Sequence, residues 1–204
     1  MDLTPDSYFT ISAPANSVYK EKGSKFIAYT FNLKSEEEVK KNLLKIKKEH
    51  FSARHICYAY RLGSSGEQTR SSDAGEPANT AGKPILNQIT SRNLTQTLVV
   101  VVRYFGGTLL GTNGLINAYR SAAAEALDKS PIVEKLITDS YKILFDYESM
   151  NDVMRIIKEN EAEQVDPVYN KQCSITINVR KKNSKKTKEK LMIIKGVRVQ
   201  ELKV

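Results

Sequence analysis

The feature of this sequence that most constrains its fold is an unbroken aliphatic run, Leu98–Val102. A strand with one face in water alternates apolar and polar residues, whereas a strand buried on both faces is apolar throughout. The run therefore predicts a central strand of a sheet that is covered on both sides. Gly106-Gly107 follow it, and then an alanine-rich segment that Thr112 is expected to cap and that continues as a helix to about Asp128.

The rest of the first part predicts further strands and helices around this strand. Ser35 opens a helix, and Glu38, three residues later, predicts a capping box. The helix after Thr112 is expected to bury the face that carries Leu115, Tyr119, Ala122 and Ala126. Strands are expected at Tyr8–Ser12, Phe26–Leu33 and His55–Leu62, a polar loop at Gly63–Pro77 and a short helix at Thr80–Thr90.

The sequence after about Ile137 predicts a second domain. A helix ends near Lys129-Ser130-Pro131, because proline cannot continue it, and we expect domains of residues 1–134 and 135–204. The order strand, helix, strand, strand, helix, strand is that of ferredoxin-like folds. The expected elements are Ser140–Phe145, Met150–Asn160, Ala162–Tyr169, Cys173–Arg180, Ser184–Met192 and Val197–Leu202, with a tight turn at Asn170-Lys171. The fold class is therefore predicted to be α+β with two domains.

Composition narrows the functional classes. No stretch approaches the roughly 20 apolar residues that span a bilayer. The N-terminus lacks a basic segment followed by an apolar one, so we expect a cytoplasmic protein without a membrane partner. Cys57 and Cys173 have no paired spacing, which argues against a disulfide scaffold or a zinc ribbon. The formal net charge of +9 favours polyanionic partners, although it also keeps proteins soluble.

The connection after the aliphatic run is the first candidate binding site. Gly106 and Gly107 permit positive φ or close backbone approach. The helix N-terminus that follows presents free N–H groups to phosphate or carboxylate, and Arg103 and Lys83 can add positive charge. The alternative is that the glycines only make a turn and Thr112 only caps. The segment does not match the phosphate-binding P-loop pattern, which ends in Gly-Lys-Ser or Gly-Lys-Thr.

The polar loop contains two carboxylates, Asp73 and Glu76. Two acids three residues apart can bind a metal or act as acid and base. We expect instead that they cap the helix at Thr80 or pair with Arg70, because a metal site needs more oxygen ligands than this segment offers. Neither a metal nor a cofactor is predicted.

Alternation along the strand from His55 places Cys57, Ala59 and Arg61 on the same face as His55. A histidine beside a cysteine permits a Cys–His nucleophile. However, Cys57 lies in mid-strand in apolar surroundings, whereas a working nucleophile is usually exposed and electropositive. We therefore expect a buried thiol, and we interpret His55 as a hydrogen-bonded or surface-binding residue.

The densest basic run is Arg180–Lys190. Such a run can track phosphates without reading base sequence, or it can simply be a solvated helix face. No aromatic residue interrupts it, so it is not a base-stacking platform. The residues assigned to a nucleic-acid-binding surface are Arg180, Lys181, Lys182, Lys185 and Lys186.

Three motifs of the first part occur together: HICYAYR from His55, SDAGEPANTAGKP from Ser72 and VRYFGGTLLG from Val102. In these motifs and their order, the chain over about Tyr8–Ser130 resembles the IMPACT/YigZ family, and the second part is similar to the small C-terminal domain of its bacterial members. The resemblance implies a first domain like domain 2 of ribosomal protein S5 and a ferredoxin-like second domain. The pair is similar to the fourth and fifth domains of elongation factor G. Eukaryotic relatives regulate translation through protein contacts.

These observations predict a binding protein of the translation apparatus rather than an enzyme, acting on structured RNA or the ribosome and modulating translation. One alternative is a regulator that binds an acidic protein partner without RNA. Another is a hydrolase that uses the region of His55, Asp73 and Glu76. The oligomeric state is not predicted. The candidate binding residues of the first domain are His55, Arg61, Arg70, Asp73, Glu76, Thr80, Lys83, Arg103, Tyr104, Gly106, Gly107, Thr112 and Asn113.

Overall fold

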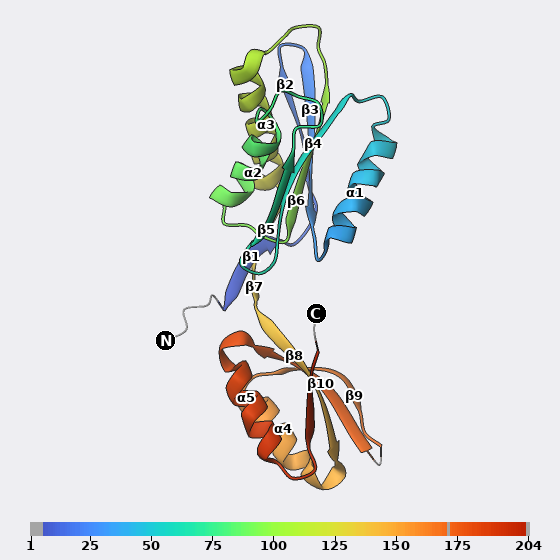
Figure 1. Cartoon of the computed structure of the whole chain (residues 1–204), viewed down its shortest axis with the longest axis vertical. Helices are drawn as coiled ribbons and strands as arrows, with labels where there is room; N and C mark the ends of the chain where they lie inside the picture. The colour runs from blue at the N-terminus through green and yellow to red at the C-terminus, as the bar shows by residue number, and fades with distance from the viewer. Residues whose placement is uncertain (1–5, 171, 203–204) are drawn as a thin grey trace. The chain divides into compact units, whose positions relative to one another are not determined.

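A computed structural model describes residues 6–170 and 172–202 of the chain. The chain divides into two compact units (Figure 1). The first comprises Tyr8–Lys135, and the second comprises Leu136 and the described residues after it, together with Asp6 and Ser7. Each unit has a hydrophobic core of its own. None of the described helices is long and apolar enough to cross a membrane.

The first unit is built on a five-stranded antiparallel sheet with the strand order β2-β3-β6-β4-β5. β6 (Thr97–Tyr104) lies at the centre, and Leu98–Val102 are completely buried. The prediction of a central strand covered on both faces is therefore confirmed. The other strands are β2 (Asn16–Glu21), β3 (Ser24–Asn32), β4 (His55–Leu62) and β5 (Gln68–Ser72).

Helices cover both faces of this sheet. α2 (Gly82–Ser91) and α3 (Gly111–Asp128) lie on one face, and α1 (Glu36–Glu49) lies on the other (Figure 1). The side chains of β4 alternate between the two cores, as predicted. Cys57 and Ala59 pack in the α2–α3 core, whereas Tyr60 and Leu62 pack in the α1 core.

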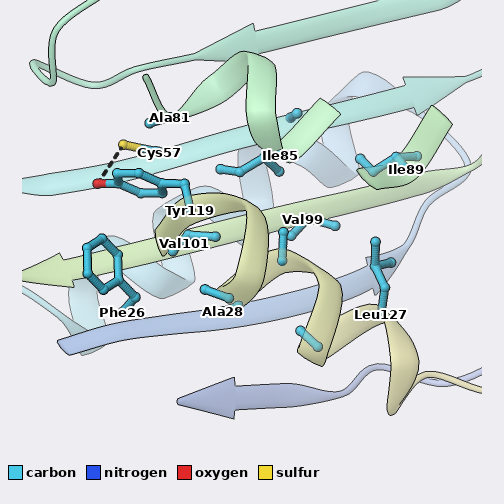
Figure 2. Packing of buried hydrophobic residues seen from close by; sticks show 14 of the residues in the cluster. Phe26, Ala28, Cys57, Ala81, Ile85, Ile89, Val99, Val101, Tyr119 and Leu127 are labelled. Carbon is cyan, nitrogen blue, oxygen red and sulfur yellow. Dashed lines mark hydrogen bonds between the residues drawn. The ribbon is translucent and has the colours of Figure 1, made fainter. Parts of the chain in front are cut away.

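The predicted buried face of α3 is confirmed, and Figure 2 shows how it packs. The Tyr119 ring meets the Phe26 ring edge-on, with the centroids 5.1 Å apart. Such edge-to-face contacts contribute beyond simple burial. Leu115, Ala122 and Ala126 complete this face of the helix.

Three strands were not predicted. β2 and β5 form the edges of the sheet, and the sequence of β5, QTRSS, contains no apolar residue to mark a strand. β7 (Ile132–Leu136) pairs with β1 (Ser7–Ile11) in a separate two-stranded sheet. The expected polar loop Gly63–Pro77 is thus wrong over residues 68–72, because an edge strand is held by backbone pairing that needs no apolar side chains.

Two predicted helix caps are wrong in detail. α3 starts at Gly111, so Thr112 lies in its first turn and does not cap it. Ser35 makes no side-chain capping bond at α1, and Glu38 accepts a hydrogen bond from the backbone N of Lys34 (2.8 Å). Glu38 therefore reaches one residue further back than a capping box requires.

The second unit is a four-stranded antiparallel sheet with the strand order β11-β8-β10-β9, and α4 and α5 lie together on one face (Figure 1). Its elements follow the predicted order βαββαβ. α5 starts at Lys181 and not at Ser184, directly after β10, and Lys171 of the predicted turn lies outside the described residues. The elements are β8 (Thr138–Asp146), a 3-10 turn (Tyr147–Ser149), α4 (Met150–Glu159), β9 (Glu163–Val168), β10 (Gln172–Arg180), α5 (Lys181–Ile193) and β11 (Arg198–Leu202).

The N-terminus of α5 is held by a residue from the other end of the sequence. The helix has no acidic residue in its first turn. Asp6 Oδ1 accepts a hydrogen bond from the backbone N of Lys182 (3.2 Å), and Oδ2 lies 3.0 Å from Nη2 of Arg180. Asp6 thus supplies the acceptor and the negative charge that stabilise a helix N-terminus.

Replacing Asp6 by alanine is expected to destabilise the second unit by about 1 kcal/mol, the usual loss when an N-terminal cap is removed. Urea unfolding followed by circular dichroism measures the change. Asp128→Ala is the control, because it breaks only an exposed pair with Arg92 and should cost about 0.5 kcal/mol or less. Equal losses in the two variants would show that Asp6 does not cap α5.

Candidate functional site

A cleft of about 670 Å³ lies where β4 begins, β6 ends and α3 begins. β4 and β6 are antiparallel, with His55 opposite Arg103, so these two side chains and Tyr104 come to the same end of the sheet. Thr112 of α3 and Glu76 of the loop before α2 add to the lining. Five of the sequence-predicted residues therefore share one cavity, whose volume is typical of ligand pockets.

Arg103 and Glu76 form a buried ion pair in this cleft. Nη1 of Arg103 lies 2.7 Å from Oε1 and 3.0 Å from Oε2 of Glu76, and the two side chains are 7% and 3% exposed. Tyr119 donates a further hydrogen bond to Oε1 (2.8 Å). Pairing of Glu76 with Arg70, one of the two alternatives expected from the sequence, does not form, because Arg103 and Tyr119 engage the Glu76 carboxylate, and Arg70 lies exposed on β5. Both carboxylate oxygens are engaged, so Glu76 acts here as the counter-ion of a buried arginine.

The network continues into the core through Cys57 (Figure 2). Its Sγ lies 3.3 Å from Oη of Tyr119 and 3.0 Å from the carbonyl oxygen of Asp73, and it can donate its single proton to either. Burial raises the pKa of the Cys57 thiol to about 12, and burial likewise raises the pKa of the Tyr119 hydroxyl. The prediction of a buried thiol is confirmed, and at neutral pH it is protonated rather than nucleophilic.

Arg103 makes contacts beyond its ion pair. Its guanidinium carbon lies 5.6 Å from the ring centroids of both Phe26 and Phe105, within cation–π range. Within the part of the chain that the structure describes, Nε of Arg103 is buried and has no hydrogen-bond partner. The first residues of α3, Gly111 and Thr112, line the same cleft. The N-terminus of α3 thus adds a partial positive charge to the cleft, beside the neutral Arg103–Glu76 pair.

Asp73 is held by backbone and does not line the cleft. Its carboxylate accepts hydrogen bonds from the backbone N of Asn79, Ala81 and Gly82, at 2.8–2.9 Å. Burial by itself raises the pKa of Asp73, but the three backbone donors outweigh it and hold the pKa below its usual value. The capping interpretation is thus confirmed for Asp73, which holds the start of α2. The arrangement of His55, Asp73 and Glu76 expected for a hydrolase does not form, because Asp73 points its oxygens at that helix.

The two glycines of the connection have different roles. A Cβ on Gly106 would lie 1.9 Å from the carbonyl carbon of Gly23, so the two backbones approach too closely for any side chain. The backbone N of Gly106 also donates to Oγ of Ser24 (3.1 Å). Gly107 has φ +86° and open space around its Cβ position. Gly106 is therefore the close-approach glycine and Gly107 the positive-φ glycine.

The remaining predicted residues of the first unit lie away from the cleft lining. Arg61 donates to the carbonyl oxygen of Leu94 (2.9 Å), and Oγ1 of Thr80 donates to that of Pro77 (2.7 Å). Both are engaged with backbone and position loops. Arg70, Lys83 and Asn113 are exposed.

Sequence reasoning missed Arg54 and the exposed apolar residues Phe105 and Leu109, all of which line the cleft. Phe105 is 56% exposed and Leu109 is 85% exposed. Periodicity gives no signal for a single exposed apolar residue in a connection. Arg54 directly precedes His55, and its position beside the motif that starts at His55 could have indicated a second positive charge at the start of the strand.

The basic run lies on α5 and is partly neutralised. Nζ of Lys181 lies 2.8 Å from Oδ1 of Asp139, and Nζ of Lys182 lies 3.6 Å from Oδ2 of Asp6. The hydrogen bond that Lys181 donates to Asp139 raises the pKa of Lys181. Lys185 and Lys186 are exposed, and no ion pair joins either to a carboxylate in residues 6–170 and 172–202. The five residues are therefore not equivalent, because Arg180 also pairs with Asp6.

Among the described residues there is no group of three or more histidine, cysteine, aspartate or glutamate side chains placed to hold a metal ion. The polar groups of the cleft are instead a buried ion pair, hydroxyls, a histidine and an exposed arginine. His55 Nδ1 lies 3.0 Å from the carbonyl oxygen of Ala74, which orients its ring. The arrangement is suited to binding an anion with an apolar part.

Fold and cleft together define a two-unit α+β protein whose first unit has a cleft lined by Arg54, His55 and the Arg103–Glu76 pair. A family model described as the Impact N-terminal domain matches residues 22–127. The chain belongs to the IMPACT family.

Relatives extend this similarity over most of the chain. IMPACT family member YigZ of Escherichia coli is 32% identical over 80% of this chain and 81% of its own length. IMPACT family member YvyE of Bacillus subtilis is 34% identical over 76% of this chain and 71% of its own length. A solved structure described as that of a hypothetical protein is 28% identical, covers 98% of both chains and has a TM-score of 0.71.

Proposed function

We propose that this protein is a non-catalytic, cytoplasmic binding protein of the translation apparatus, which binds structured RNA or the ribosome and modulates translation. The proposal includes the finer fold assignments: a first unit like domain 2 of ribosomal protein S5 and a ferredoxin-like second unit, as in the fourth and fifth domains of elongation factor G. The resemblance to the IMPACT family, whose eukaryotic members regulate translation, supports the link to translation, and the family's N-terminal domain matches residues 22–127. Fold similarity alone does not fix function, so the proposal rests on the chemistry of the surface.

The observation that carries the proposal is the exposed lysine pair of α5, Lys185 and Lys186, in a chain of formal net charge +9. A lysine without a carboxylate partner releases a counter-ion from RNA when it meets a phosphate. A lysine that is already paired gains less, since it exchanges one anion for another. Lys185 and Lys186 are therefore the residues of α5 that contribute most to binding a polyanion.

The state of the reactive groups in the first unit supports binding rather than catalysis. Cys57 is protonated and buried, Glu76 is paired with Arg103, and Asp73 is held by three backbone donors. Each of these groups acts structurally.

The test is a binding titration across salt concentrations on ribosomal RNA and on an unrelated structured RNA. Replacing Lys185 and Lys186 by glutamine should weaken binding to both RNAs equally. It should also flatten the dependence of log affinity on log salt by about 0.7–0.9 for each phosphate that the variant no longer binds. The matched control is the Lys181→Gln, Lys182→Gln variant, which removes the same charge from the same helix and should flatten the slope less.

Equal slopes in wild type and the Lys185/Lys186 variant would contradict the assignment to α5. Absence of RNA binding in wild type, together with protein partners that survive nuclease treatment in a pull-down, would contradict RNA binding altogether. The protein-interaction alternative would then hold.

A further inference from the structure

A second hollow adjoins the cleft. A cavity of about 620 Å³ lies beside α1 and the start of β4, and its lining includes Lys47, Phe51 and Arg54. Arg54 also lines the first cleft. Arg54, an exposed residue directly before β4, is therefore shared by the two hollows.

Each hollow has an exposed phenylalanine in its lining. Phe51, after the end of α1, is 88% exposed, and Phe105, after the end of β6, is 56% exposed. Covering a large exposed apolar side chain with a flat apolar group lowers the free energy, because both surfaces leave water. Two exposed rings, in hollows that share one arginine, form a combination of aromatic and basic residues by which proteins bind unpaired bases.

The charges around the two hollows favour an anionic ligand. Lys47 and Arg54 are exposed, and His55 lies partly exposed beside Arg54. Among the described residues, the only carboxylate in the two linings is Glu76, which is neutralised by Arg103. His50, which also lines the second hollow, is occupied on both ring nitrogens by Tyr29 and Tyr104 hydroxyls at 2.8 and 2.9 Å. It therefore helps to form the wall and is not free to bind.

We propose that these two hollows form a site for single-stranded RNA, in which one unpaired base stacks on Phe51, another stacks on Phe105, and Arg54 binds the phosphate between them. The site deepens the proposed function and rests on it, since it assigns unpaired nucleotides to the first unit and duplex phosphates to α5. Duplex RNA keeps its bases stacked inside the helix and cannot offer them to the two rings.

The experiment is fluorescence anisotropy with the full chain, using a labelled single-stranded oligouridine and an RNA duplex without loops. Phe51→Ala and Phe105→Ala should each weaken binding of the single strand by about fivefold or more, the typical loss of one base–aromatic stack. Binding of the duplex should be unchanged. Tyr147→Ala is the matched control, because it removes an aromatic ring that is 73% exposed in the second unit.

Conservative variants separate stacking from simple loss of surface. Phe51→Tyr and Phe105→Tyr keep a stacking ring and should retain single-strand affinity, whereas Phe51→Leu and Phe105→Leu should lose it. They also control for folding, since Phe105 contacts Arg103.

The outcomes distinguish this inference from the function on which it rests. If wild type binds the duplex with strong salt dependence but the phenylalanine variants bind the single strand like wild type, only the single-strand site is wrong. If wild type binds neither RNA, the proposed function fails, and this site with it. A third outcome is that polyglutamate displaces the oligonucleotide and that Phe51→Ala and Phe105→Ala weaken polyglutamate binding as much as RNA binding. This outcome would point to an acidic protein and overturn the assignment to RNA.

Discussion

Replacing Glu76 by glutamine is expected to lower the free energy of unfolding of the first unit by about 3 kcal/mol, since removing one partner of a buried ion pair leaves an uncompensated charge. The side chain of Arg103 is only 7% exposed, and Glu76 is its only carboxylate partner among the residues that the structure describes. Glutamine preserves the shape of the side chain and can still accept from Tyr119 or from Arg103. The loss therefore reports the charge and not a cavity.

Urea unfolding followed by circular dichroism measures this loss. Glu67→Gln is the control, because Glu67 is an exposed carboxylate of the first unit, in the turn between β4 and β5, and it accepts hydrogen bonds from Ser65. A double variant that adds Arg103→Met should lose less free energy of unfolding than the two single variants lose together. The reason is that it removes the charge that Glu76→Gln leaves unpaired. Additive losses would mean that Arg103 and Glu76 do not stabilise each other.

The elements that the sequence predicted are those with a local apolar signal. Leu98–Val102 has apolar residues on both faces of β6. Along β4, Cys57 marks the face that packs in one core and Tyr60 marks the face that packs in the other. The spacing of Leu115 and Tyr119 on α3 carries the same information at helical period. Each of these patterns depends on which side chains avoid water, and the residue types alone determine that.

The parts that were missed depend on partners distant in sequence. Asp6 caps a helix that begins 175 residues later, as the separation of 176 between Asp6 and Lys182 shows. Glu76 pairs with Arg103 rather than with Arg70, which is nearer in sequence, because the sheet brings the end of β6 to the loop. A strand such as β5 is defined by backbone pairing and needs no apolar residue. None of these relations leaves a periodic pattern in the chain.

The candidate site shows the same division. Residues beside the glycine connection and at the start of β4 were singled out from motifs, and the fold gathers His55, Arg103, Tyr104 and Thr112 in one cleft. Arg61, by contrast, shares a face with Cys57 but lies at the far end of β4, where it binds backbone. Side-chain alternation gives the face of a strand but not the position of its ends relative to a cavity.

Gly106→Ala is expected to destabilise the first unit by about 3 kcal/mol, at the upper end of the usual cost of overpacking. Its Cβ would lie 1.9 Å from the carbonyl carbon and 2.3 Å from the carbonyl oxygen of Gly23, and both are backbone atoms that cannot rotate away. Relief requires the turn between β2 and β3 to move away from the end of β6. That movement also breaks the hydrogen bond from Gly106 to Ser24.

The neighbouring glycine provides the matched control for this prediction. Gly107→Ala makes the same chemical change one residue later, where no atom lies within 4 Å of the new Cβ. Its cost should be about 1–2 kcal/mol, from the positive φ alone. Gly107→Val should cost more than Gly107→Ala, because a β-branched residue tolerates positive φ poorly. Urea unfolding of the three variants gives the order directly. If Gly107→Ala proves as destabilising as Gly106→Ala, backbone strain rather than close approach to Gly23 governs this connection.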